Sequence, residues 1–184
     1  MRGTLFLVVG PSGVGKDTLI EVAAKARPDL LVPMRTVTRP VASGGETIRS
    51  LTPGAFDAAE AAGAFMLSWR AHGLAYGVPR TAAERLAAGQ DVLVNVSRSV
   101  VAAARAAFQP VRVLAIVAPA EVLAARLAAR GREPAEDIAR RLAQSTRPVP
   151  DGDDVILIQN AGTLETAVAA FLAALQPESA CEAK

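Results

Sequence analysis

The residues best suited to chemistry gather in the stretch GPSGVGKD at positions 10–17. Gly10, Gly15 and Lys16 satisfy the spacing G-x-x-x-x-G-K, which is typical of a loop that binds nucleotide phosphates. Glycines let the backbone curl so that N–H groups point at phosphate oxygens, and the lysine reaches the outer phosphates. We therefore expect a nucleotide phosphate site whose contacts are Gly10, Pro11, Ser12, Gly13, Val14, Gly15, Lys16, Asp17 and Thr18.

Asp17 stands where most such loops place a Ser or Thr hydroxyl that binds Mg²⁺. A carboxylate is a strong ligand for this hard cation, but without the metal it would repel the nearby phosphates. We therefore predict that Asp17 belongs to the Mg²⁺ shell. The alternative is that Asp17 only caps the first turn of the helix.

Arginine is the second residue type that points to phosphate, because its planar fork of donors matches phosphate oxygens. The chain has 17 arginines and three lysines. Arg126 and Arg130 are four residues apart, so a helix places them on one face, and Arg141 follows about three helical turns later. Such arginines could neutralise charge on a phosphoryl group in transfer, whereas a solvated arginine face is the plainer interpretation.

Short apolar runs alternate with helical patterns along the chain, which favours parallel strands joined by crossover helices in a three-layer α/β fold. The expected strands are Leu5–Val9, Leu31–Val37, Val92–Val96, Val111–Val117 and Val155–Gln159. The expected helices are Lys16–Ala26, Pro53–Ala62, Thr81–Ala88, Ser99–Phe108, Ala120–Ala129, Ala135–Ser145 and Leu164–Leu175. The segment 38–79 fits this alternation poorly, and such insertions often carry sites.

Length and composition predict a single domain over residues 1–176 and a polar tail over 177–184. A net charge of +2 gives no reason to expect nucleic acid or a membrane as a partner. Cys181 is the only cysteine, which excludes a disulfide framework, and the N-terminal apolar run is too short for a signal peptide. We expect a cytoplasmic protein with small-molecule substrates, and a homodimer is compatible with the sequence.

Further motifs make the chain resemble the guanylate kinase family along most of its length. These motifs are GPSGVGK, TRP at 38–40, GE at 45–46, YG at 76–77, RLAARG at 126–131, RRL at 140–142 and IQN at 158–160. The resemblance implies a P-loop NTPase fold with a central parallel sheet, an acceptor-binding subdomain near 34–80 and a lid near 130–137. It carries over Arg39, Glu46 and Tyr76 as acceptor-site residues, and Arg130 and Arg141 as lid arginines that act with Lys16 in catalysis.

The departures from guanylate kinase fall on the residues that read guanine. Leu67 occupies the position of a base-reading glutamate, Val78 replaces a hydroxyl residue, and Val94 and Val96 replace the aspartates of a central strand. A site that hydrogen-bonds a base discriminates by orders of magnitude. The joint loss of these groups indicates an acceptor without guanine.

A better resemblance is to the ribose 1,5-bisphosphate phosphokinases of phosphonate degradation. It rests on GPSGVGKDTL, TRP, LSWRAHGLAYGV at 67–78, DVLVNVSRS at 91–99 and RLAARGRE at 126–133. This family implies ATP-dependent phosphorylation of ribose 1,5-bisphosphate to 5-phosphoribosyl 1-diphosphate (PRPP). Ile48 and Arg70 depart from this family's pattern at positions near the acceptor.

The residues suit this reaction, because a phosphate monoester is largely deprotonated at neutral pH and needs no general base. Catalysis should then rest on alignment and charge neutralisation. Arg98 follows an apolar strand at its carboxyl end, where ligands of parallel sheets bind. Asn95 beside it could hydrogen-bond ribose hydroxyls, or it could only tie the strand to a loop.

Three alternatives stay open at this point. The first is a guanylate kinase with altered base contacts. The second is a catalytically silent binding module, which the presence of Lys16 and the lid arginines disfavours. The third is a gluconate- or shikimate-type kinase, which would need a base to deprotonate a hydroxyl acceptor.

Overall fold

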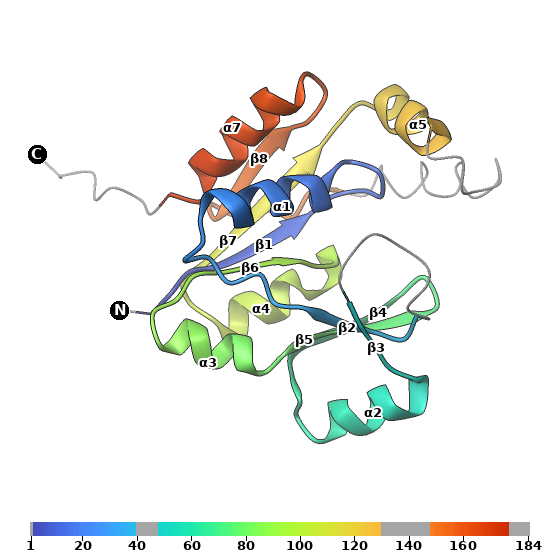
Figure 1. The fold of residues 1–184 in the computed structure, drawn as a ribbon, viewed down its shortest axis with the longest axis vertical. Helices are drawn as coiled ribbons and strands as arrows, with labels where there is room; N and C mark the ends of the chain where they lie inside the picture. Colours follow the sequence, from blue (N-terminus) through green and yellow to red (C-terminus); the bar gives the residue numbers. More distant parts are fainter. Residues whose placement is uncertain (1, 40–47, 130–147, 177–184) are drawn as a thin grey trace, which may run out of the picture.

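Residues 2–39, 48–129 and 148–176 are described by the computed structural model of this chain, and they form two sheets (Figure 1). The first sheet has four parallel strands in the order β6-β1-β7-β8. They are β1 (Leu5–Val9), β6 (Val92–Asn95), β7 (Val111–Val117) and β8 (Val155–Gln159). All of β1 is buried, as expected for a central strand covered on both faces.

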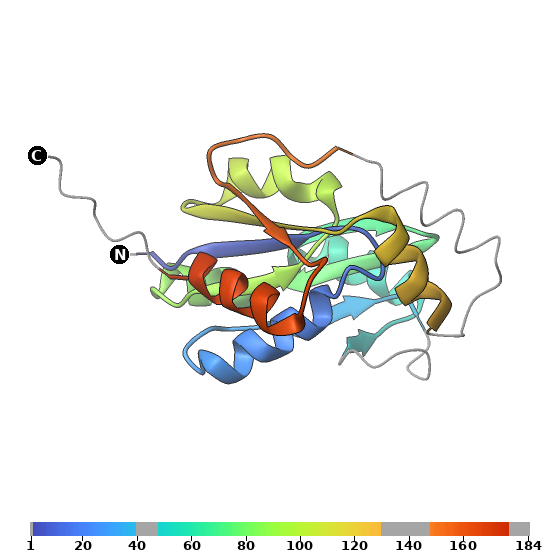
Figure 2. The same ribbon diagram turned by 90° about the horizontal axis from the view of Figure 1, so that it is seen from above.

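Helices cover both faces of the first sheet, so the predicted three-layer α/β fold with a central parallel sheet is confirmed (Figure 2). On one face, α1 (Lys16–Ala26) lies beside α7 (Leu164–Ala174). The opposite face is covered by α3 (Thr81–Ala87), the short 3-10 helix η1 (Arg98–Val100) and α4 (Val101–Ala107). The remaining described helix of this region, α5 (Ala120–Ala129), follows β7.

Alternate side chains of β1 enter two hydrophobic clusters, one on each face of the sheet. Phe6, 1% exposed, packs in one cluster with Leu19 of α1 and Phe171 of α7. Leu7 packs in the other cluster with Val101 of α4. Burial of a side chain the size of Phe6 contributes about 2–3 kcal/mol. The sheet that carries the glycine-rich loop is therefore held firmly on both sides.

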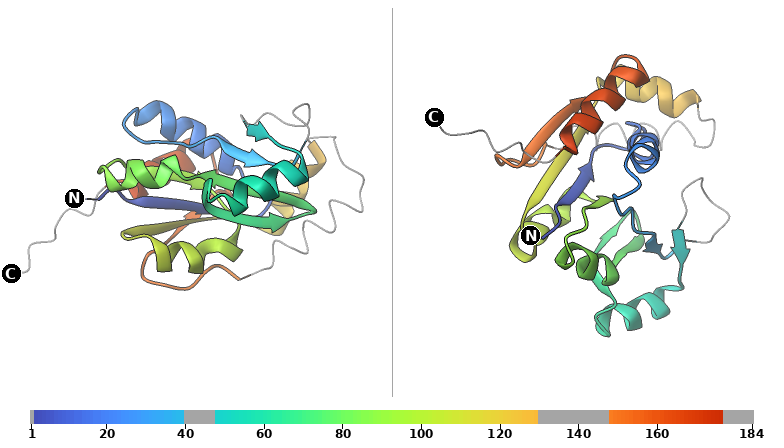
Figure 3. Two further views of the ribbon diagram at one scale, coloured as in Figure 1. Left: turned by 90° about the horizontal axis from the view of Figure 1, so that it is seen from below. Right: turned by 60° about the vertical axis from the view of Figure 1, so that its left-hand side comes forward.

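The second sheet is mixed and has the order β3-β2-β5-β4. Its strands are β2 (Arg35–Val37), β3 (Ile48–Ser50), β4 (Phe65–Ala71) and β5 (Leu74–Pro79), with α2 (Pro53–Ala61) between β3 and β4. Strands β2 and β3 are parallel, while β5 is antiparallel to both β2 and β4. Figure 3 shows this sheet and α2 together on one side of the first sheet.

The two faces of the second sheet have different neighbours. Trp69 and Tyr76 are cross-strand partners on one face, and they pack against the hydrophobic cluster of the first sheet. On the other face, Phe65 stacks on Phe56 of α2 with ring centroids 4.7 Å apart. One face of the second sheet therefore turns toward the first sheet, and the other packs on α2.

The predicted strand Leu31–Val37 is wrong as a single element. Leu31 forms an isolated bridge with Val92 at the edge of the first sheet, whereas β2 begins at Arg35 in the second sheet. Pro33 lies between these two parts, and proline cannot donate a backbone N–H to a sheet ladder. The chain therefore passes from one sheet to the other at this point.

The strands of the second sheet other than β2 were not predicted. Strands β4 and β5 form a hairpin whose two-residue turn is His72 (φ 54°) and Gly73 (φ 73°), and positive φ at both positions suits the twist of a hairpin. The predicted helix Ser99–Phe108 is divided into η1 and α4, while the predicted helix Ala135–Ser145 lies outside the described residues. Among the described helices, none combines the length and the apolar character that crossing a bilayer requires.

Candidate active site

The glycine-rich loop connects the end of β1 to the start of α1, as the sequence predicts. Gly10, Gly13 and Gly15 have φ values of 155°, 82° and 91°, which favour glycine. A Cβ atom on Gly15 would lie 2.7 Å from Asn160 Nδ2. Val14 is fully buried and anchors the loop in the core beneath it. The loop is therefore fixed in a curled shape whose backbone can face phosphate oxygens.

Asn160 supports this loop from the end of β8. Its side chain is 4% exposed, and Nδ2 donates a hydrogen bond to the Val14 carbonyl at 2.7 Å. Its backbone N–H donates to the Val117 carbonyl at 2.8 Å, which holds the residue beside β7. Sequence reasoning noticed Asn160 only as part of the IQN motif and did not predict this contact.

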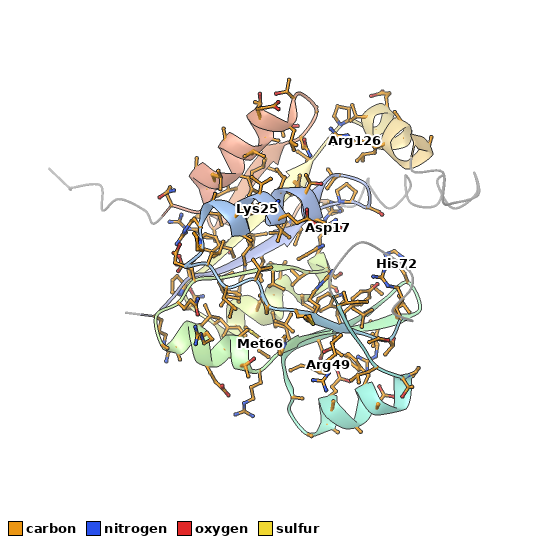
Figure 4. The ribbon with its side chains drawn as sticks, in the orientation of Figure 1. Asp17, Lys25, Arg49, Met66, His72 and Arg126 are labelled. Atoms are coloured by element: carbon orange, nitrogen blue, oxygen red, sulfur yellow. The ribbon has the colours of Figure 1, made fainter. Side chains whose placement is uncertain are left out.

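Lys16 is the first residue of α1, and its ammonium group folds back over the loop. Nζ donates hydrogen bonds to the carbonyls of Gly10 and Pro11, both at 2.9 Å. The charge is thus held at the mouth of the loop, where phosphates would sit. Figure 4 places Asp17 at the same end of α1 and Lys25 toward the other end, so Lys25 does not belong to this site.

Asp17 is exposed and interacts with the carboxyl end of β6. The side-chain amide of Asn95 donates a hydrogen bond to Asp17 Oδ1 at 3.0 Å. The backbone carbonyl of Asn95 in turn accepts a hydrogen bond of 2.7 Å from Arg35 Nη1. Asn95 therefore connects the phosphate loop to the second sheet through two separate groups.

A cleft of about 290 Å³ opens between the loop, the end of β6 and the second sheet. The structure brings most described candidates to its walls, namely Gly10, Pro11, Ser12, Gly13, Gly15, Lys16, Asp17, Thr18, Tyr76, Asn95 and Arg98. Val14 points into the core instead. Arg39 does not line this cleft; its Nε is buried without a hydrogen-bond partner among the described residues. Glu46, Arg130 and Arg141 lie outside the described residues.

Arg35 lines the cleft and was not predicted as a site residue. It is 8% exposed, and its guanidinium carbon lies 5.8 Å from the centroid of the Tyr76 ring. The sequence offered one usable signal, because Arg35 is the charged residue within an otherwise apolar predicted strand. A charge that is buried in this way usually serves an ion pair or a ligand.

Trp69 and Tyr76 form the aromatic part of the cleft wall. Their rings are nearly parallel, with centroids 5.3 Å apart and an angle of 6° between planes. Trp69 is 7% exposed and packs in the cluster of the first sheet. The two rings therefore stack side by side on the face of the second sheet that lines the cleft.

The positions that replace guanine-reading groups are buried and aliphatic. Leu67 is 7% exposed, Val78 is fully buried, Val94 is 1% exposed and Val96 is 5% exposed. Aliphatic side chains cannot hydrogen-bond the edge of a purine. At the four positions where the guanylate kinase family reads guanine, this chain therefore has no side chain that could do so.

Comparisons with known proteins place these features in a family. The family model described as an AAA domain matches residues 5–148. The chain is 42% identical over 180 residues to the ribose 1,5-bisphosphate phosphokinase PhnN of Ruegeria sp. (strain TM1040), covering 97% of this chain and 95% of that protein. It is also 44% identical to a bifunctional ribose 1,5-bisphosphokinase-thymidine phosphorylase of Azorhizobium caulinodans, covering 97% of this chain but 26% of that longer protein.

A solved structure shares the fold. The guanylate kinase of Anaplasma phagocytophilum superimposes with a TM-score of 0.65, covering 95% of this chain and 85% of that one at 17% identity. The structural likeness supports the P-loop NTPase fold. The relative from Ruegeria, which matches over nearly its full length, defines the family more narrowly. The chain carries an AAA domain and belongs to the ribose 1,5-bisphosphate phosphokinase family.

Proposed function

We propose that this protein transfers the γ-phosphoryl group of ATP to the 1-phosphate of ribose 1,5-bisphosphate, which gives PRPP and ADP. The observation that carries the proposal is the 42% identity, over nearly the full length of both chains, to a relative named for this substrate. The cleft supports it from the structure, since a phosphate loop and two further arginines line one cavity.

The residues at the guanine-reading positions disfavour the guanylate kinase alternative. A guanine-binding site must supply hydrogen-bond partners to the ring, because unpaired polar groups of a base cost binding energy. Leu67, Val78 and Val94 are buried in the hydrophobic core, and Val96, just after β6, is the one of the four that lines the cleft. A sugar with two phosphates is instead bound mainly by cationic side chains.

The cations of the site have distinct proposed roles. Lys16 and the loop N–H groups bind the phosphates of ATP, and Lys16 neutralises charge that develops during transfer. Arg98, which follows β6, binds the acceptor in the cleft together with Tyr76 and Asn95. The acceptor site also includes Glu46 and Arg39, although Arg39 does not line the described cleft. Arg130 and Arg141 complete the catalytic set as arginines of a lid.

The acceptor oxygen belongs to a phosphate, so the reaction does not require a base. Its second pKa is near 6, and the group is therefore largely dianionic at pH 7. The site has to bring this anion against the γ-phosphoryl group in line, and to offset the repulsion between the two. Alignment by fixed cations is the contribution that the residues of this cleft can make.

The donor set around Asp17 fits Mg²⁺. This metal commonly binds through one or two carboxylates together with substrate phosphates, and it does not need a cage made only of protein ligands. Asp17 is exposed at the cleft, and Asn95 orients one carboxylate oxygen. When bound, Mg²⁺ would offset the negative charge of the ATP phosphates. We assign Asp17 as the protein ligand to the metal.

The proposal also includes an arrangement of segments. Residues 34–80 form the acceptor-binding subdomain and residues 130–137 form the lid, within one domain over 1–176 that precedes a tail over 177–184. The partners are ATP and a small phosphorylated sugar, not nucleic acid or a membrane. We further propose a cytoplasmic location and a homodimer, and sedimentation of the purified protein would test the latter.

Phosphorus NMR of the product tests the reaction directly. Incubation with ribose 1,5-bisphosphate, ATP and Mg²⁺ should give two coupled diphosphate resonances from the sugar product, along with those of ADP. GMP in place of the sugar should give little ADP. The variant Lys16→Met should lose at least about a hundredfold in kcat, as expected for removal of a charge-stabilising group. Efficient phosphorylation of GMP with no turnover of the sugar bisphosphate would disprove the proposal.

A further inference from the structure

We propose that Arg35 forms a binding subsite for the second phosphate of the acceptor, the one that does not react. This inference rests on the proposed function, since it assigns one end of a sugar bisphosphate to a residue without an assigned role. The subsite lies on the cleft wall that the second sheet forms, whereas the reacting phosphate must lie near the phosphate loop. Three observations support it.

The first observation is the distribution of charge on the second sheet. Val37 is paired with Tyr76, so Arg35, two residues earlier on β2, shares the face that Tyr76 presents to the cleft. Arg49 of β3 and Arg70 of β4 pair with residues of the opposite face, on the side of α2. Among the described residues of strands β2, β3, β4 and β5, Arg35 is the charged residue that faces the cleft. An anion bound against this wall would meet it.

The second observation is that the guanidinium is held in place. Nη1 donates to the Asn95 carbonyl at 2.7 Å, and the Tyr76 ring lies beneath the guanidinium at 5.8 Å. Tyr76 is itself stacked on Trp69. A planar guanidinium that is oriented in advance loses little conformational entropy when it contacts a phosphate.

The third observation is the position of Arg35 relative to the donor side. Asn95 lies between Arg35 and the donor side of the cleft. Its side chain contacts Asp17, while its backbone carbonyl contacts Arg35. The γ-phosphoryl group and the phosphate that attacks it must lie on the Asp17 side, beside Lys16. Arg35 would then contact the non-reacting phosphate, at the other end of the sugar ring. The cleft thus has anion positions on two walls, as a sugar with phosphates at both ends requires.

Inhibition by half-substrates tests the subsite. Ribose 5-phosphate carries only the non-reacting phosphate, and ribose 1-phosphate carries only the other. Both should compete with ribose 1,5-bisphosphate in the wild type. Arg35→Gln should weaken inhibition by ribose 5-phosphate, and raise KM for the bisphosphate, by about 10- to 100-fold, the range of one charge-assisted hydrogen-bonded pair. Inhibition by ribose 1-phosphate and kcat should change little.

Two further variants complete the experiment. Arg35→Lys keeps the charge but not the fork, so it should show an intermediate loss for ribose 5-phosphate. Arg49→Gln is the matched control, since Arg49 is exposed, lies on the neighbouring strand and belongs to the opposite face. It should leave both inhibition constants unchanged. If Arg35→Gln fails to fold by circular dichroism, Arg35→Lys and the wild-type competition still give the answer.

The outcomes separate the subsite from the proposed function. An equal loss for ribose 1-phosphate and ribose 5-phosphate would overturn the subsite, as would a wild type that ribose 5-phosphate does not inhibit. In both cases PRPP would still form from ribose 1,5-bisphosphate. A wild type that forms no PRPP at all would instead contradict the proposed function.

Discussion

The side chain of Asn95 donates a hydrogen bond to Asp17 Oδ1 at 3.0 Å, and this contact joins the carboxyl end of β6 to the first turn of α1. It holds a carboxylate at the edge of the phosphate loop, close to where the ATP phosphates are expected. Both partners are accessible from the cleft. The contact explains how an acidic residue can be kept in one orientation beside a phosphate site.

Asp17→Asn should weaken the binding of Mg²⁺, so that the enzyme needs a higher Mg²⁺ concentration for activity. Removal of the carboxylate charge weakens the Mg²⁺ site but also relieves repulsion of the phosphates when no metal is present. We expect the Mg²⁺ concentration for half-maximal activity to rise about tenfold, the effect of about 1.4 kcal/mol. ATP binding without Mg²⁺ should improve. Activity titrated against Mg²⁺ measures the first effect, and calorimetry in EDTA measures the second. Asp57→Asn is the control, and it should not change the Mg²⁺ titration. An unchanged Mg²⁺ titration in Asp17→Asn would contradict the role of Asp17 as a metal ligand.

Asn95→Ala distinguishes two roles for this residue. The backbone carbonyl that accepts from Arg35 remains, while the donor to Asp17 is lost. If the amide mainly orients Asp17, the Mg²⁺ requirement should rise about three- to tenfold, in line with one hydrogen bond, and KM for the acceptor should stay nearly constant. A rise in acceptor KM without any change in the Mg²⁺ titration would show that Asn95 contacts the ribose instead.

Asn160→Ala should loosen the phosphate loop. The Val14 carbonyl loses the donor that lies 2.7 Å away, in a buried place that water does not readily reach. An unsatisfied buried group costs about 1–3 kcal/mol, so the thermal midpoint should fall and KM for ATP should rise. Gln159→Ala changes the exposed preceding residue and should alter neither quantity. An unchanged ATP KM in Asn160→Ala would show that the loop keeps its shape without this support.

Glu60 should contribute stability that disappears in acid. The hydrogen bond from Arg70 is the main cause that lowers the pKa of Glu60 below its ordinary value of 4.5, with a smaller contribution from Ser68. A lowered folded-state pKa stabilises the protein above the unfolded pKa, and this contribution is lost as the pH falls through the folded value. Glu60→Gln should therefore lower the thermal midpoint slightly at pH 7, and the difference should shrink as the pH falls below 4.5 and through the lowered folded-state pKa.

The melting curves of Glu60→Gln should be measured at several pH values beside those of Glu84→Gln, an exposed carboxylate on α3. The control should not show the same pH dependence. The effect is expected to be small because the pair is partly exposed, with 50% of the Arg70 side chain and 34% of the Glu60 side chain accessible. A difference that grows toward low pH would have the wrong sign for a lowered pKa.

Local residue patterns were sufficient to predict the phosphate loop and the sheet that carries it. Leu5–Val9 is apolar throughout, and Val111–Val117 is apolar apart from Arg112, because both faces of the central sheet are covered, so local pattern and tertiary environment agree. The loop could be recognised because its glycines meet a backbone requirement that few other residues satisfy. The family was visible as well, since its motifs occur in order along most of the chain, and the full-length relatives confirm it.

The wall of the cleft that the second sheet forms depends on long-range packing, which local residue patterns do not show. Arg35 lay within a single predicted strand, because Pro33 marks a break in strand pairing but does not show that the two parts belong to different sheets. Likewise, the contact of Asn95 with Asp17 spans 78 residues, and that of Asn160 with Val14 spans 146. Such contacts depend on the register and crossing of distant strands. Sequence pattern reports which face a residue occupies, whereas the packing of the two sheets decides which residues meet across the cleft.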